Sequence, residues 1–112
     1  MRPELLAAVS SPRRCEILRM VWVDECSAGD IHRAMGDVSF AAVSQQLRVL
    51  SDKGLVTVRP DGRQRFYRAD RSALAPVAPM LEAMWDQALW RLKLAAELEH
   101  ARRGPRPRRR RR

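Results

Sequence analysis

Apolar residues recur at intervals of three and four along the N-terminal half of the chain, which is the spacing of amphipathic helices. The first such run, residues 3–9, predicts a short helix. The second begins after Ser11 and Pro12, which are residue types favoured at an N-cap and at the first helical position. It predicts a helix over residues 12–24.

Two more helices follow, separated by a short turn. Ser27 stands three residues before Asp30, as in a capping box, and begins a helix that ends before Gly36. After the turn, Ser39 caps a helix over residues 39–53. Two helices joined by a short glycine-containing turn predict a helix-turn-helix.

The helix over residues 39–53 has two chemically different sides. Its apolar side consists of Val43, Leu47 and Leu50. The opposite side carries small, amide and charged residues, namely Ala41, Ser44, Gln45, Arg48 and Asp52. A solvated helix face more often carries several Glu–Lys pairs, so this side favours contact with a flat, polar, negatively charged partner.

After Gly54 the helical spacing gives way to a strand pattern. The segment LVTVR is rich in β-branched residues, and Pro60-Asp61-Gly62 separates it from RQRFYRA. This pattern predicts a β-hairpin over residues 55–69 with its turn at residues 60–62, anchored by two aromatic side chains. Its basic residues are Arg59, Arg63, Arg65 and Arg68.

The last predicted helix runs from about residue 77 to residue 101 and has an unusually wide apolar face. One small domain cannot easily cover such a face, so we expect a subunit interface there. The alternative is that it packs only on the first two helices of its own chain. The expected dimer interface comprises Leu5, Leu6, Val9, Leu81, Trp85, Ala88, Leu92 and Ala95.

The charge is unevenly distributed along the chain. Of the net charge of +9, residues 102–112 contribute eight arginines, so residues 1–101 total only +1. Within them, residues 43–71 hold seven Arg or Lys against three Asp, and this end favours a nucleic-acid partner. We expect one domain over residues 1–101 and a disordered arginine-rich tail, which either holds phosphates without sequence preference or has no role of its own.

The expected cellular compartment is inferred from the lack of a membrane span and of a secretion signal. No run of about 18 apolar residues predicts a membrane span, and the N-terminal apolar run is too short for a secretion signal. We therefore expect a cytoplasmic protein with no membrane partner. In a helix over residues 12–24, Cys15 and Cys26 would lie about 16 Å apart, beyond the limit of about 7 Å for a disulfide. Free thiols are the expectation.

Helix-turn-helix, arginine-bearing hairpin and flanking long helix together predict a winged helix, mainly α with a small β-hairpin. Three motifs, SSPRRCEIL, SAGDIHRAMGDVSFAAVSQQLRVLSDKGLV and PDGRQRFYRA, resemble the ArsR family of bacterial winged-helix transcriptional repressors over about residues 5–101. The resemblance implies a homodimer, formed through the N- and C-terminal helices, that binds double-stranded DNA at a promoter operator and blocks transcription.

In such a protein, residues 39–53 form the recognition helix and residues 55–69 the wing. The amide of Gln45 can pair with adenine, Arg48 can reach guanine or a phosphate, and Ser39 presents helix N–H groups to a phosphate. The expected DNA contacts are Ser39, Ala41, Ser44, Gln45, Arg48, Arg63 and Arg65, the last two in the minor groove or on the adjacent backbone. A dimer predicts inverted half-sites about 34 Å apart.

Metal-sensing members of the family commonly carry Cys-x-Cys before the recognition helix, or Asp-x-His and further histidines on the last helix. Here the corresponding helix, SAGDIHRAM, has no cysteine, and Asp86-Gln87-Ala88 lacks the first histidine. A closed zinc site needs about four ligands, so we expect neither a metal nor another cofactor. Cys15 and Cys26 leave open a thiol- or metalloid-responsive repressor.

Other classes of function fit the sequence less well. No nucleophile–base pair, phosphate loop or metal cluster predicts an enzyme. An RNA-binding winged helix is an alternative, but the Ser/Gln/Arg helix face favours the deep major groove of B-DNA over the narrow A-form groove. A protein-interaction module is a further alternative, against which the positive charge of residues 43–71 argues.

Overall fold

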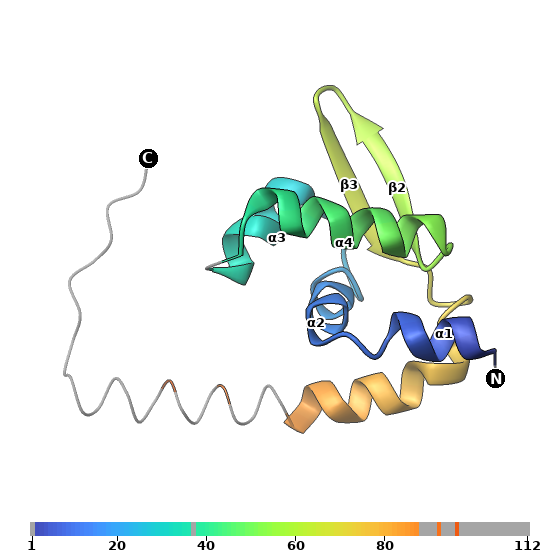
Figure 1. Cartoon of the computed structure of the whole chain (residues 1–112). Helices are drawn as coiled ribbons and strands as arrows, with labels where there is room; N and C mark the ends of the chain where they lie inside the picture. Colours follow the sequence, from blue (N-terminus) through green and yellow to red (C-terminus); the bar gives the residue numbers. More distant parts are fainter. Residues whose placement is uncertain (1, 37, 88–91, 93–95, 97–112) are drawn as a thin grey trace. The chain divides into compact units, whose positions relative to one another are not determined.

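The computed structural model describes residues 2–36, 38–87, 92 and 96. It divides into two compact units, Met1–Pro79 and Met80–Arg112. The described residues of the first unit form the α-helices α1 to α4 and a small sheet, with the hairpin standing beside the longest of these helices (Figure 1). This unit carries the seven predicted DNA-contact residues, from Ser39 to Arg65.

The first two helices are α1 (Pro3–Ala8) and α2 (Pro12–Met20). The predicted N-cap of α2 is confirmed, since the Ser11 hydroxyl accepts a hydrogen bond from the Arg14 N–H. The predicted end at residue 24 is wrong, because α2 ends at Met20. In a longer helix the Val21 carbonyl would accept an intrahelical hydrogen bond. Here it accepts a hydrogen bond of 2.9 Å from the Ala69 N–H.

Helices α3 (Ala28–Met35) and α4 (Phe40–Asp52) form the predicted helix-turn-helix. The hydroxyls of Ser27 and Ser39 cap them, accepting backbone N–H groups three residues ahead at 3.0 and 3.1 Å. The Asp30 carboxylate pairs with Arg33. A φ of 72° at Gly54, a value that favours glycine, lets the chain leave α4 and enter the sheet.

The sheet contains the short strand β1 (Cys26–Ser27) and the hairpin strands β2 (Val56–Asp61) and β3 (Gln64–Ala69), in the antiparallel order β1-β3-β2. The hairpin is confirmed, but its predicted turn at residues 60–62 is wrong. Asp61 pairs with Gln64, so Gly62 and Arg63 form a two-residue turn. Gly62, with φ of 62°, occupies the first turn position, where a tight hairpin requires positive φ.

The apolar side of α4 is buried, as predicted. Val43, Leu47 and Leu50 are each at most 1% exposed. Other fully buried side chains of the first unit are Ile17, Leu18, Val21, Ile31, Leu74 and Val77. Burying a side chain of this size contributes about 1.5 to 3 kcal/mol, so the core fixes which side of α4 faces solvent.

After the 3₁₀ turn η1 (Ala75–Val77), residues 78–87 are helical, close to the predicted start of the last helix. Most of the predicted course to residue 101, and the tail over residues 102–112, lie outside the described residues. No helix in the described part of the chain has the length and apolar character to span a lipid bilayer. Mainly α structure with a small sheet confirms the predicted fold class.

The predicted dimer-interface residues differ in exposure. Leu5 and Val9 of the first unit are buried in the single chain, whereas Leu6 is 47% exposed. In the second unit, Leu81 and Trp85 are buried and Leu92 is exposed, while Ala88 and Ala95 lie outside the described residues. The interface therefore stays a prediction.

Candidate nucleic-acid interface

The solvent side of α4 presents the predicted recognition residues. Ala41, Gln45 and Arg48 are exposed, and Ser44 is half-buried. Ser39 is exposed at the helix start, and its hydroxyl is engaged in the cap. Helical spacing and the buried opposite side place these residues on one face, with the short side chains nearest the N-terminus.

A cleft of about 620 Å³ separates α4 from the hairpin. Ser44, Arg48 and Asp52 line it from α4, and Ser27 and Gly29 line it at the start of α3. The hairpin contributes Val58, Arg63, Gln64, Arg65 and Tyr67. The fold thus brings four of the seven predicted contacts to one cleft, while Ser39, Ala41 and Gln45 are not among its lining residues.

The charged lining of this cleft is mostly basic. Its three arginines, Arg48, Arg63 and Arg65, are all exposed, and Asp52 is the acidic residue of the lining. None of the described residues forms an ion pair with these three arginines. Their guanidinium groups are therefore available to phosphates, for which a planar guanidinium offers a bidentate fork.

The two faces of the hairpin differ in how they use arginine. Because side chains alternate along a strand, Arg65 and Tyr67 share the face that lines the cleft, and Phe66 points to the other face. Arg59 pairs with Phe66 in the strand register, and its guanidinium lies over the Phe66 ring at 4.7 Å. Arg59 therefore belongs to the outer face.

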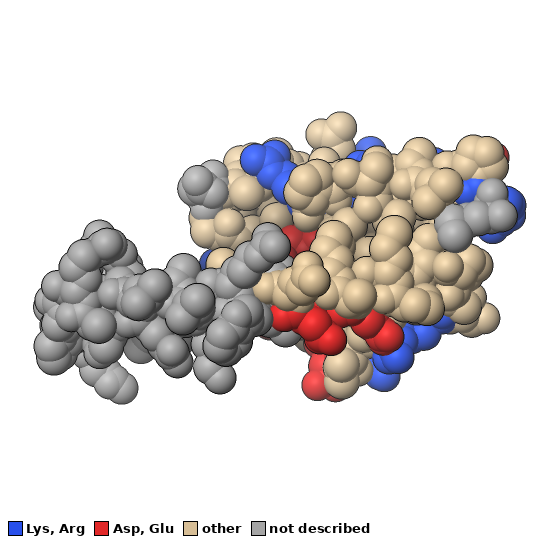
Figure 2. Space-filling view, turned by 90° about the horizontal axis from the view of Figure 1, so that it is seen from below, with Lys and Arg blue, Asp and Glu red and all other residues tan. Residues whose placement is uncertain are grey.

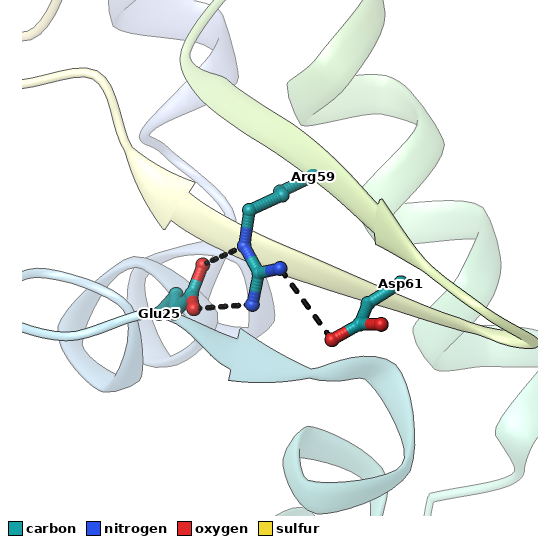
Figure 3. Close-up of polar contacts among 3 residues, drawn as sticks. All are labelled: Glu25, Arg59 and Asp61. Atoms are coloured by element: carbon teal, nitrogen blue, oxygen red, sulfur yellow. Dashed lines mark hydrogen bonds and ion pairs between the residues drawn. The ribbon is translucent and has the colours of Figure 1, made fainter.

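The charge of Arg59 is neutralised by two carboxylates (Figure 3). Its Nε and Nη2 donate to the two carboxylate oxygens of Glu25 at 3.0 and 2.6 Å, and its Nη1 lies 3.5 Å from Asp61 Oδ2. The hydrogen bonds from Arg59 lower the pKa of Glu25, and the same bonds raise the pKa of Arg59. Sequence reasoning left Arg59 out of the expected DNA contacts but could not find its acidic partner, because Glu25 lies 34 residues away.

Phe40 and His32 form an aromatic pair beside the cleft. Their ring centroids lie 5.5 Å apart in an edge-to-face arrangement, and Phe40 remains 49% exposed. The structure shows His32 half-buried against Phe40, which lines the cleft together with wing residues.

A second view of the molecule shows a different distribution of charge. On the face drawn in Figure 2, most of the described surface is uncharged, several acidic side chains lie together near its lower edge, and the basic side chains lie in separate places, one group beside the acidic ones. The described residues therefore form no continuous basic surface on that face. The cleft between α4 and the hairpin differs from this face, because it combines arginines that pair with no acid among the described residues with the polar side of α4.

Known proteins share this architecture. A helix-turn-helix domain family matches residues 9–59. The HTH-type transcriptional regulator Rv2034 of Mycobacterium tuberculosis is 40% identical over 63 residues, 56% of this chain and 58% of that protein. The transcriptional activator HlyU of Vibrio cholerae is 31% identical over 84 residues, 75% of this chain and 77% of the relative.

Among solved structures, a homodimeric winged helix-turn-helix DNA-binding domain of Mycobacterium bovis, described as a possible ArsR-family transcriptional regulator, is similar with a TM-score of 0.63. It is 25% identical, and the match covers 75% of this chain and 77% of that chain. The chain belongs to the ArsR family. The winged-helix resemblance is thereby confirmed, and both curated relatives are named as regulators of transcription, not as enzymes.

The two thiols of this ArsR-family chain are free and lie in different environments. Cys15 is buried, and its Sγ donates to the Val9 carbonyl at 2.9 Å. Cys26 is half-buried in β1, with its Sγ 3.5 Å from the Met20 carbonyl. Burial raises the pKa of both thiols, which favours the protonated, less nucleophilic form.

Metal-sensing members of the ArsR family need several ligands in one place. Within the described ranges, no three His, Cys, Asp or Glu side chains come together as a metal-binding group. Of the residues compared with the zinc-sensor pattern, Asp86 and Gln87 are exposed at the end of the described helical run, and Ala88 lies outside the described residues.

Proposed function

We propose that the chain is a homodimeric transcriptional repressor that binds an inverted-repeat operator in double-stranded DNA. The observation that carries the proposal is the cleft between α4 and the hairpin, where Arg48, Arg63 and Arg65 have no acidic partner among the described residues. Such arginines replace the counterions of phosphates, and this term supplies a large share of DNA-binding affinity.

Base recognition falls to the exposed side of α4, which enters the major groove. Gln45 reads adenine through N6 and N7, and Arg48 contacts guanine or a phosphate. Ala41 and Ser44 are small enough to let the helix approach the base edges. The N–H groups at the start of α4, after the Ser39 cap, bind a phosphate, while Arg63 and Arg65 contact the minor groove or the adjacent backbone.

The dimer is supported by exposed apolar side chains on the same helices as the predicted interface residues. Leu6 of α1 is 47% exposed, and Met80 and Met84 of the last helix are 50% and 41% exposed. The solved Mycobacterium bovis relative is described as homodimeric. Two copies place two α4 helices about one DNA turn apart, which fits inverted half-sites.

Activation is the second candidate outcome of operator binding, because the Vibrio cholerae relative is named an activator. Both outcomes use the same DNA-binding surface and differ in where the operator lies. Transcription in vitro from a promoter carrying the selected operator distinguishes them. A fall in transcript on adding the protein supports repression, and a rise supports activation.

Selection of bound duplexes from a random DNA pool, at about 150 mM salt to screen weak tail-driven binding, tests the proposal. A palindromic motif is the expected result. Binding that is motif-free and salt-sensitive would contradict it and would assign DNA binding to residues 102–112. Preference for single-stranded RNA in a parallel selection would favour the RNA-binding alternative.

A further inference from the structure

One guanidinium connects three helices of the first unit. Arg14, half-buried in the first turn of α2, donates from Nε to the Ala8 carbonyl at 2.7 Å and from Nη2 to the Ala7 carbonyl at 3.3 Å. From Nη1 it donates to Gln46 Oε1 of α4 at 2.9 Å. Its side chain thus joins the last turn of α1 to the recognition helix.

The α1 end of this connection is closely held. The Ala7 carbonyl also accepts the Ser10 hydroxyl, and the Val9 carbonyl accepts the Cys15 thiol. A cation at the C-terminal end of a helix also interacts favourably with the helix dipole. Because an isolated helix as short as α1 is not stable in water, α1 is held by these bonds to the start of α2 together with the burial of Leu5 and Ala8.

The α4 end of the connection differs in kind from the rest of the buried surface of this helix. Val43, Leu47 and Leu50 hold α4 by apolar packing, and the hydrophobic effect behind it has no preferred direction. The Arg14–Gln46 hydrogen bond has a preferred distance and angle. Gln46 directly follows Gln45, the proposed base-reading residue, so a shift at Gln46 moves Gln45 too.

We propose that Arg14 is a positioning residue that couples α1 to the recognition helix and thereby sets the half-site spacing the dimer accepts. The inference rests on the proposed function, since α1 belongs to the proposed dimer interface. In a dimer, the distance between the two α4 helices depends on where each α4 lies relative to the helix at the interface. A firm connection between these two helices limits how much that distance can vary. Arg14 supplies the directional part of that connection.

The test compares Gln46→Leu with Gln46→Glu. Leucine removes the acceptor but leaves the bonds of Arg14 to α1, whereas glutamate keeps an acceptor and turns the hydrogen bond into an ion pair. Affinities are measured for the selected operator and for operators with one or two base pairs added or removed between the half-sites. The readout is the ratio of the affinity for native spacing to the affinity for altered spacing.

We expect Gln46→Leu to lower this ratio about fivefold, the size expected when each of the two subunits loses one hydrogen bond at the weak end of the usual range, and Gln46→Glu to retain it. Combining Gln46→Leu with Arg14→Met should lower the ratio no further than Arg14→Met alone, because both remove the same connection. Arg13→Gln, a change at the exposed neighbour, is the matched control and should leave the ratio unchanged. Thermal unfolding of each variant separates positioning from loss of fold.

If the Arg14–Gln46 bond only stabilised the fold, the affinity ratio would respond differently. If Gln46→Leu left the ratio unchanged in a folded protein, whether or not it weakened binding to every spacing by the same factor, the inference would be overturned. The proposed function would still stand. If the wild-type protein selected no motif with two half-sites, the proposed function would fail and the inference with it.

Discussion

Arginines on the two faces of the hairpin should differ in how they affect the salt dependence of operator binding. Arg65 lines the cleft and pairs with no acid among the described residues, whereas Arg59 is held by Glu25 and Asp61. Arg65→Gln should therefore remove a phosphate contact and reduce the salt dependence. Arg59→Gln should leave the salt dependence unchanged, because Arg59 already has its counterions within the protein.

The size of the effect follows from counterion release. Each phosphate contact changes the slope of log affinity against log salt by about 0.9, so losing one contact per subunit of a dimer changes it by about 1.8. Between about 50 mM and about 200 mM salt, the wild-type protein should then lose about twelvefold more affinity than Arg65→Gln.

Fluorescence anisotropy with a labelled operator duplex, titrated at four or five salt concentrations, measures both slopes. Arg13→Gln, remote from the hairpin in sequence, serves as the control for a general loss of positive charge. An equal change of slope in Arg59→Gln and Arg65→Gln would refute the reasoning, because it would mean that the Glu25 pair does not withhold Arg59 from DNA.

Three further outcomes are expected. Gln45→Ala should relax the base preference at one symmetric operator position by about 1 to 3 kcal/mol, measured by repeating the selection; equal weakening on all sequences would contradict the assignment. Leu50→Ala should lower the free energy of unfolding by about 2 to 5 kcal/mol in urea denaturation, because Leu50 is fully buried. Since the folded-state pKa of Glu25 is lowered, its ion pair stabilises the fold above the ordinary glutamate pKa, and this contribution is lost as the pH falls through the lowered value. Arg59→Gln should therefore raise the NMR titration midpoint of the Glu25 carboxyl, and an unchanged midpoint would exclude the pair in solution.

Features encoded within a few residues were predictable from the sequence. The Ser27 and Ser39 caps bond to N–H groups three residues ahead, and the buried side of α4 follows from helical spacing. The residue types of the recognition face followed in the same way. These signals depend on neighbours in the chain, so one sequence was enough to find them.

Features that depend on distant partners were not predictable. Helix α2 stops at Met20 because the next carbonyl bonds to Ala69, and β1 exists because Cys26 and Ser27 pair with β3. In the candidate site, the sequence showed four hairpin arginines but could not show that Glu25 holds one of them. The connection from Arg14 to Gln46 likewise spans 32 residues.

The order of the sheet also affects how the protein behaves toward other chains. Among the described residues, strand β2 is paired on one side only, by β3, so the hairpin has a free edge. Unpaired backbone groups on such an edge can recruit a strand from another molecule and begin aggregation. Pro60 has no N–H to offer, and the charged Arg59 and Asp61 flank it in the edge strand. The hairpin can therefore project from the domain while its free edge resists pairing with a strand of another molecule.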